Sequence, residues 1–398
     1  MSLQSVPFSK ISEAEVQRLL DYGVGESVRL DYKRQNYGTS ESDRKEFLKD
    51  VSSMANTLGG DLIIGVSETD GLPQSISPLV GDSDKEVQRL EQIAITGLEP
   101  RIRNLEIRPI PLAAGGYLIL VRVPRSYLAP HRVILVNSAR FYARAGTTTY
   151  EPNVDQLRQM FTATPLIADK IKAFHTDRLI RITANETPVA MNAAGKFVIH
   201  VVPIPAFTGS SMMDLIARLS VGTHVPVPPD EVGQLTRQSV NLDGYLNYTR
   251  NSSSRDARTA YAQFFRNGVI EGVADLRTDD GTSSRLVGAP FVRLVVDNVK
   301  QYLATADHYD MGLPAYVFLS LCNASNTVYR YPIPGGGFQE SDPFGREIIA
   351  LPEIYIDSFD VDVATAMRPA FNVLWNAFGH YHCDVYDADG KIREAVND

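Results

Sequence analysis

The chain reads GESVRLDYK over residues 25–33, and apolar and charged side chains alternate along the second half of this stretch. An alternation with a period of two is typical of a β-strand with one buried face. Asp31 and Lys33 then share one face of the strand, whereas Leu30 and Tyr32 share the other. The stretch therefore predicts a strand that carries an acid and a base side by side.

Helices are expected on both sides of this strand in the sequence. Ser12 and Glu15 have the spacing of a capping box and begin a short amphipathic helix that ends near Gly23. Residues 35–43 are polar and predict a loop. Apolar residues then recur at helical spacing over residues 47–58, and two glycines follow.

More strands and helices complete the first part of the chain. Residues 61–66 read DLIIGV, a short apolar run that predicts a buried strand, and the polar residues 67–71 predict a turn. Mixed strands and helices of this kind indicate an α+β domain. The remaining expected elements are a helix over 84–96, strands over 105–109, 117–123 and 140–144, and a final helix over 154–161.

The length of 398 residues predicts two domains. We expect an N-terminal mixed-sheet domain over residues 1–165, a connecting segment over 166–184 and a second α+β domain over 185–398. Strands are expected in the second domain over 196–205 and 313–321, and helices within 285–305 and over 363–378. No sequence feature assigns a role to this second domain.

The composition indicates an ordered globular protein, because 44% of the residues are hydrophobic and 22% are charged. We expect no membrane-spanning segment, since the sequence has no run of 18 apolar residues. The first residues lack an apolar block of signal-peptide length, so we expect a cytoplasmic protein. The two cysteines predict reduced thiols rather than a disulfide framework.

The net charge of −8 is distributed unevenly. Residues 1–165 hold 19 Lys and Arg against 20 Asp and Glu, whereas residues 166–398 hold 20 against 27. Arginine suits bidentate contact with phosphate, so a run of arginines with few acids is a candidate surface for nucleic acid. An ordinary solvated face whose arginines pair with the acidic C-terminal half stays open as the alternative. Residues 101–144 hold a single acid, Glu106, and eight arginines: Arg101, Arg103, Arg108, Arg122, Arg125, Arg132, Arg140 and Arg144.

Three pieces of the sequence, in order, resemble the Schlafen-type AlbA domain. They are GESVRLDYK at 25–33, MANTLGG at 54–60 and LIIGV at 62–66, and the later stretches PH at 130–131 and FYARAGT at 141–147 are similar to the family's closing segment. The resemblance covers roughly residues 11–161. An ordered match of several parts is more specific than any single short motif.

This resemblance implies that the first domain handles nucleic acid. In the nuclease members it further implies three carboxylates that cut RNA, transfer RNA in particular, with a divalent metal. The first carboxylate falls on Glu26, and the second on Asp31, which stands where the family has the longer Glu. The third is expected just after the LIIGV strand, where this chain has Ser67; Glu68 is then the first choice, and Asp70 is the alternative.

The chemistry of such a site explains why a metal is expected. Three carboxylates that lie close together raise one another's pKa unless a cation neutralises them, and oxygen ligands select hard ions such as Mg²⁺ or Mn²⁺. Hydrolysis of a phosphodiester also needs positive charge and an activated water. Lys33, on the same face as Asp31, is placed to approach the reacting phosphate.

We therefore expect a nucleic-acid-binding protein that acts as a metal-dependent endoribonuclease on structured RNA such as transfer RNA. Two other classes stay open: a noncatalytic regulatory protein that binds DNA or RNA, and a protein-interaction scaffold. We also expect a homodimer, although the sequence identifies no interface residues for it. The expected catalytic residues are Glu26, Asp31, Lys33 and Glu68, the expected metal ligands are Glu26, Asp31 and Glu68, and the expected nucleic-acid-binding residues are Arg101, Arg103, Arg122, Arg125, Arg132, Arg140 and Arg144.

Overall fold

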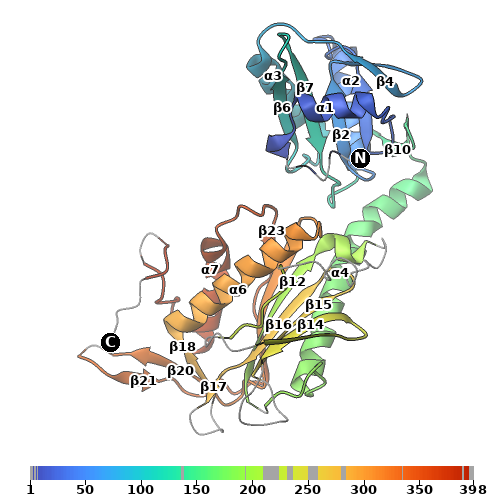
Figure 1. The fold of residues 1–398 in the computed structure, drawn as a ribbon. Helices are drawn as coiled ribbons and strands as arrows, with labels where there is room; N and C mark the ends of the chain where they lie inside the picture. The colour runs from blue at the N-terminus through green and yellow to red at the C-terminus, as the bar shows by residue number, and fades with distance from the viewer. Residues whose placement is uncertain are drawn as a thin grey trace. The chain divides into compact units, whose positions relative to one another are not determined.

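The structure is a computed structural model, and its residues divide into two compact units (Figure 1). Unit 1 comprises Met1–Leu166 and unit 2 comprises Ile167–Asp398; the division falls within helix α4 (Val154–Thr183). The structure describes residues 3, 6, 8–135, 139–192, 194–208, 224–230, 236–249, 259–278, 284–333, 335–387 and 390–393.

Unit 1 is built on a four-stranded sheet with the order β1-β2-β7-β6. Strand β1 is parallel to β2, and the other two pairs are antiparallel. The strand expected around Asp31 is therefore an edge strand of a mixed sheet. The bounds are β1 (Leu30–Lys33), β2 (Gly60–Ile64), β7 (Tyr117–Val123) and β6 (Glu106–Pro111).

Helices cover both faces of this sheet. Helix α1 (Glu13–Asp21) packs on one face with Ile63 of β2, whereas α2 (Glu41–Ala55) and α3 (Ser83–Gly97) pack on the other with Leu62 and Ile64. Successive residues of β2 thus enter opposite cores, as the pleat of a strand requires. Because both faces are covered, all five residues of β2 are buried.

The helix starts follow their caps. The Ser12 and Glu15 capping box predicted for α1 is confirmed. Helix α2 begins at Glu41, inside the stretch expected to be a loop, because Ser40 and Asp43 form a second capping box there. The sequence pattern missed this start because the first turn of α2 is exposed and carries no apolar stripe.

Short strands surround the sheet of unit 1. The residues expected to form a turn after β2 instead begin a hairpin of β3 and β4, with Asp70 and Gly71 at its tip. A three-stranded sheet has the order β5-β8-β9, and β10 pairs with β11. The bounds are η2 (Phe8–Lys10), β3 (Val66–Thr69), β4 (Leu72–Ile76), β5 (Leu98–Glu99), β8 (Arg132–Val133), β9 (Arg140–Phe141), β10 (Ala143–Ala145) and β11 (Thr148–Tyr150).

Unit 2 contains an antiparallel sheet with the order β13-β14-β15-β16-β12-β19-β22, and β23 also pairs with β19. A second sheet has the order β17-β18-β20-β21. The strands expected over 196–205 and 313–321 are confirmed as β12 and β19. The bounds are β12 (Lys196–Pro203), η3 (Ile204–Phe207), β13 (Thr236–Val240), β14 (Gly244–Thr249), β15 (Ala260–Phe265), β16 (Ile270–Asp275), β17 (Arg277–Thr278), β18 (Ser284–Val287), β19 (Ala315–Cys322), β20 (Thr327–Pro332), β21 (Phe338–Glu340), β22 (Ile348–Ala350) and β23 (Ile354–Ile356).

Helices α6 (Gly288–His308) and α7 (Val363–Ala377) form the main core of unit 2 against one face of the large sheet (Figure 1). The only tryptophan of the chain, Trp375 of α7, is fully buried there. The C-terminal half of α4 packs on the other face, where Leu179 and Ile182 join a smaller core. Both units are α+β, as expected.

Helix α4 is longer than its sequence pattern indicates. The pattern predicts an end at Phe161 and a connecting segment over 166–184, but the helix continues through Pro165 to Thr183. Its later residues are ordered by burial in unit 2, which the local pattern of residues 154–161 does not contain. None of the helices in the described ranges combines the length and apolarity needed to cross a membrane.

Gly59, four residues after the last residue of α2, has a left-handed conformation and offers a test of this fold. Its φ is +67°, and a Cβ atom there would lie 2.5 Å from the backbone nitrogen of Arg125. Gly59→Ala should destabilise unit 1 by about 1–2 kcal/mol from backbone strain plus about 1–3 kcal/mol from the clash. Urea unfolding followed by circular dichroism measures the effect, with Trp375 fluorescence as a reference for unit 2.

Gly146→Ala is the matched control for this prediction. Gly146 has a similar φ of +61°, but a Cβ atom there would meet nothing within 4 Å. The control should show the strain alone. Equal destabilisation in the two variants would contradict the close approach of Gly59 to the backbone of Arg125, which follows β7.

Candidate functional site

Asp31 and Lys33 of β1 lie on the face of the sheet that α2 covers. One oxygen of Asp31 accepts a hydrogen bond from Lys33 Nζ at 2.6 Å, and the other accepts one from Arg144 Nη1 at 2.8 Å. The side chain of Arg144 is completely buried, and that of Asp31 is 7% exposed. Asp31 is thus held between two cations inside the protein.

Asp50 of α2 joins this cluster, although the sequence pattern did not single it out. Its Oδ2 accepts a hydrogen bond from the Tyr37 hydroxyl at 2.7 Å and lies 3.7 Å from Lys33 Nζ. Burial raises the pKa of Asp50, and the Lys33 charge opposes that rise. A signal did exist: Asp50 lies three residues after Phe47 and one before Val51, so it stands on the buried face of α2.

Glu26 lies beside the cluster, at its partly exposed end. Its Oε1 accepts a hydrogen bond from the backbone nitrogen of Tyr32 at 2.9 Å, and its own backbone nitrogen donates to the Gly71 carbonyl at 2.7 Å. Burial and then the neighbouring Asp31 charge raise the pKa of Glu26. The structure therefore brings together three of the four residues expected to be catalytic: Glu26, Asp31 and Lys33.

Lys33 responds to the same neighbours. Burial by itself would lower the pKa of Lys33, but the charges of Asp50, Asp31 and Glu26 outweigh burial and leave this pKa raised. The side chain of Lys33 is 29% exposed, and its ammonium group contacts the buried carboxylates of Asp31 and Asp50.

Glu68, the fourth residue, has a different role in the structure. Its side chain is exposed, and its Oε2 accepts a hydrogen bond from the backbone nitrogen of Gly71 at 2.7 Å, which closes the β3–β4 hairpin. The alternative, Asp70, is also exposed and stands at the hairpin tip with a φ of +54°. Neither side chain enters the cluster around Asp31.

These residues do not fit a divalent metal in this arrangement. The described ranges contain no group of three His, Cys, Asp or Glu side chains placed to hold a metal ion. The charge that a metal would supply to Asp31 already comes from Lys33 and Arg144. The expected trio of Glu26, Asp31 and Glu68 is therefore not assembled, and Mg²⁺ or Mn²⁺ stays a prediction without a ligand set.

Several arginines of the 101–144 segment have acidic partners, and these partners come from unit 1 rather than from the acidic C-terminal half. Arg122 pairs with Asp61 at 2.8 Å and also donates to the carbonyls of Leu3 and Val6. Arg132 donates to Glu99 at 2.8 Å, and Arg140 pairs with Glu151. A local excess of arginine in the sequence thus becomes a set of ion pairs in the fold.

The burial of each arginine decides which can meet a phosphate. Arg144, expected to bind nucleic acid, is instead a buried partner of Asp31, and Arg122 is largely engaged with Asp61 and backbone carbonyls. Arg125 is partly buried, and its guanidinium lies 5.6 Å from the Tyr127 ring centre. The arginines with exposed or half-exposed side chains are Arg101, Arg103, Arg132 and Arg140.

Unit 2 holds a second polar cluster, between α4 and the large sheet, that the sequence did not reveal. Arg178 of α4 makes two hydrogen bonds of 2.8 Å to Glu271 of β16, and the Tyr261 hydroxyl donates to the same carboxylate at 2.9 Å. His200 of β12 links Glu271 to His175 of α4 at 2.8 and 3.1 Å. Glu271, His200 and Tyr261 are fully buried, so this cluster anchors α4 rather than meeting a substrate.

One arrangement of protons satisfies the chain of histidines. Ser320 donates to His175 Nε2 at 3.3 Å, His175 Nδ1 donates to His200 Nδ1, and His200 Nε2 donates to Glu271. His175 is then neutral, and Arg178 balances the carboxylate. Burial, followed by the neighbouring His200, lowers the pKa of His175 to about 3.

Arg144→Met tests the role of the buried pair. Removal of the guanidinium leaves the Asp31 carboxylate with one cation in a buried place, and removal of one partner of a buried ion pair costs about 3–5 kcal/mol. Urea unfolding followed by circular dichroism should show this destabilisation in unit 1. Arg140→Met, four residues earlier in an exposed pair, should leave stability almost unchanged; equal effects would mean that Asp31 does not depend on Arg144.

The His175 cluster predicts how the stability of unit 2 depends on pH. The folded pKa of about 3 lies below the unfolded value of about 6.5, so the unfolded state binds more protons between these values. The free energy of unfolding is therefore highest above about pH 6.5 and falls as the pH drops toward 3. Urea midpoints from Trp375 fluorescence at pH 7 and pH 5 should show this fall in the wild type and a smaller one in His175→Gln. The variant His382→Gln, at an exposed position, is the control. If the urea midpoint of His175→Gln falls between pH 7 and pH 5 as much as that of the wild type, His175 is not neutral in the folded protein.

One family model matches the sequence of unit 1. Residues 26–153 match the family model described as Schlafen, AlbA_2. No curated protein matches the chain.

Two solved structures are similar to part of the chain. The DIP2311 protein from Corynebacterium diphtheriae is 18% identical over 35% of this chain and 26% of that chain, with a TM-score of 0.26. The N-terminal domain of a protein from Nitrosomonas europaea, described as related to the ATP-dependent DNA helicase RecG, is 23% identical over 34% of this chain and 92% of that chain, also with a TM-score of 0.26. This chain thus spans about a quarter of the length of the first of these proteins.

The family match contains β1, α2 and β10, the elements that carry Asp31, Asp50 and Arg144. It also contains the whole 101–144 arginine segment. Residues 26–153 of this chain are a Schlafen AlbA_2 domain.

Proposed function

We propose that unit 1 binds nucleic acid and that its exposed arginines contact the phosphate backbone. The observation that carries this proposal is the Schlafen AlbA_2 match over residues 26–153, which includes the exposed side chains of Arg101, Arg103, Arg132 and Arg140. A guanidinium group forms two parallel hydrogen bonds with a phosphate, which suits these positions to the backbone of a strand.

The ion pairs of this surface support the proposal rather than oppose it. Arg132 and Glu99 are 44% and 56% exposed, and Arg140 and Glu151 are 56% and 51% exposed. Water and salt screen exposed pairs, so a phosphate can replace the carboxylate at little cost. Arg122 and Arg144, by contrast, hold the fold together and would not be released.

Cleavage of RNA is the second candidate function, and the cluster around Lys33 favours it. Burial raises the pKa of Glu26, which is the direction that favours a carboxyl group as a general acid or base. Lys33 supplies a partly exposed positive charge beside it. Because the carboxyl groups do not fit a metal, we derive no step through Mg²⁺ or Mn²⁺; a metal-dependent endoribonuclease acting on structured RNA such as transfer RNA stays a prediction.

Binding titrations across salt concentration test the main proposal. Labelled transfer RNA, single-stranded RNA and duplex DNA should each bind with an affinity that falls steeply as salt rises, because phosphate contacts release counterions. The variant Arg101→Ala/Arg103→Ala should bind more weakly. The slope of the logarithm of its affinity against the logarithm of salt concentration should be smaller by about one for each phosphate that the protein no longer neutralises. Arg237→Ala, an exposed cation of unit 2, is the control; a salt response that is flat for all three ligands would instead support a protein-interaction scaffold.

Incubation with transfer RNA, with and without added Mg²⁺ or Mn²⁺ and a chelator, tests cleavage. Glu26→Gln should abolish any cutting, whereas Glu68→Gln should leave it intact because Glu68 lies on the hairpin. Cutting that persists in Glu26→Gln would exclude the cluster as the catalytic site. Tight binding without cutting would favour the noncatalytic regulatory class.

A further inference from the structure

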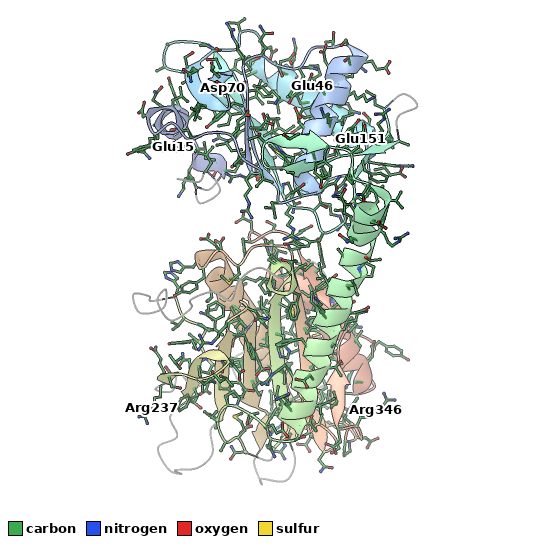
Figure 2. All side chains as sticks on the ribbon, turned by 90° about the vertical axis from the view of Figure 1, so that its right-hand side faces the viewer. Glu15, Glu46, Asp70, Glu151, Arg237 and Arg346 are labelled. Atoms are coloured by element: carbon green, nitrogen blue, oxygen red, sulfur yellow. The ribbon has the colours of Figure 1, made fainter. Side chains whose placement is uncertain are left out.

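A cavity of about 460 Å³ lies in unit 1 between α2 and the segment from Tyr142 to Glu151. We call it the α2–β11 pocket. Glu46 of α2 and Glu151, which follows β11, are labelled on these two elements in Figure 2. Its volume falls within the range of about 300–1,000 Å³ of small-molecule sites in proteins.

One wall of the α2–β11 pocket is cationic. Lys45 and Lys49 both line it, and they stand four residues apart on α2, so their side chains project from the same helix face. Both side chains are partly buried, which reduces the screening of their charges by water. The two ammonium groups can therefore bind one anionic group, such as a phosphate.

The opposite wall is aromatic and carries hydroxyl groups. Tyr142 and Tyr150 line the pocket together with Thr149. The backbone on this side is fixed, because the Tyr142 carbonyl accepts a hydrogen bond from Asn56 Nδ2 at 2.9 Å and β10 pairs with β11. Tyr142 is 5% exposed and belongs to the core of unit 1, so the partly exposed ring of Tyr150 is the surface for the flat face of a base. The hydroxyls of this wall suit a sugar or a phosphate.

The carboxylates of the pocket limit what the ligand can be. Glu46 and Glu151 would repel a ligand that carried only negative charge, such as free phosphate, but a carboxylate accepts hydrogen bonds from the amino group of a base. The pocket thus combines groups for a phosphate, a sugar and a base, and it is too small for a stacked duplex. We infer that the α2–β11 pocket holds one unpaired nucleotide of a single-stranded or looped nucleic acid.

The place of the pocket agrees with this inference, which rests on the proposed function of unit 1. Lys49 is adjacent in sequence to Asp50 of the buried cluster, and the Glu46 charge is felt by Asp50 and Tyr37. Arg140, proposed to contact phosphate, pairs with Glu151 at the pocket. A strand that crosses the exposed arginines would accordingly have one nucleotide in the pocket.

The test uses the full-length protein and two kinds of ligand. Adenosine 5′-monophosphate is titrated by calorimetry beside adenosine and inorganic phosphate, and single-stranded RNA is compared with a duplex of the same sequence. The nucleotide should bind more tightly than either of its parts, and the single strand should bind more tightly than the duplex. Tyr150→Ala and Lys45→Ala/Lys49→Ala should each weaken nucleotide binding about tenfold. Each should also reduce the ratio of the affinity for the single strand to the affinity for the duplex.

Matched variants separate the pocket from general effects. Tyr150→Phe keeps the ring and should keep most of the binding, whereas Tyr22→Ala removes a 74% exposed tyrosine elsewhere in unit 1 and should change nothing. Lys85→Ala, on α3, is the control for the lysines because its side chain is 81% exposed outside the pocket. Circular dichroism spectra confirm that each variant is folded.

The outcomes distinguish the two proposals. If the RNA binds with a steep salt dependence but the pocket variants bind nucleotide and single strand as the wild type does, the pocket inference is overturned and the proposed function stands. If the nucleotide binds through the pocket residues but no RNA or DNA binds, the proposed function fails and the pocket is a site for free nucleotides. Absence of binding by every ligand would overturn both.

Discussion

The buried ion pair between Asp31 and Arg144 is the constraint on which unit 1 depends. It joins β1 to β10 across 113 positions of sequence, and both side chains are almost completely buried. A buried carboxylate is tolerated only when its charge is balanced and its oxygens are hydrogen-bonded. Lys33 and Arg144 meet both conditions, and this balance draws Asp50, Tyr37 and Glu26 into one polar cluster against α2.

This balance also decides what the cluster can do. A carboxylate that is already held by two cations is a poor ligand for a third cation, and Glu68 lies on its hairpin outside the cluster, so the expected metal trio is not assembled. Glu26 and Lys33, at the edge of the cluster, are partly exposed and have raised pKa values. Unit 2 also contains a buried ion pair between an arginine and a carboxylate. There the pairing of Arg178 with Glu271 holds α4 on the large sheet.

The arginines of residues 101–144 show why a local count of charge is a weak guide to a surface. Seven excess positive charges in the sequence become a mixture of buried, paired and exposed groups, because acids outside the segment meet them in the fold, namely Asp61, Glu99 and Glu151. The arginine surface that we propose for phosphate contact is smaller than the sequence indicates. It is also better defined, since it lies beside a pocket with lysines on one wall and tyrosines on the other.

Periodicity and short motifs within a few residues are enough to establish the α+β class, the Schlafen AlbA resemblance, the α1 cap and the strand that places Asp31 beside Lys33. The partners of these residues are set by the folded chain instead. Asp50 reaches Lys33 from helix α2, Arg144 reaches Asp31 from strand β10, and α4 extends to Thr183 because unit 2 buries its later turns. Charge pairing and burial act between segments far apart in the chain, so no local pattern of residues contains them.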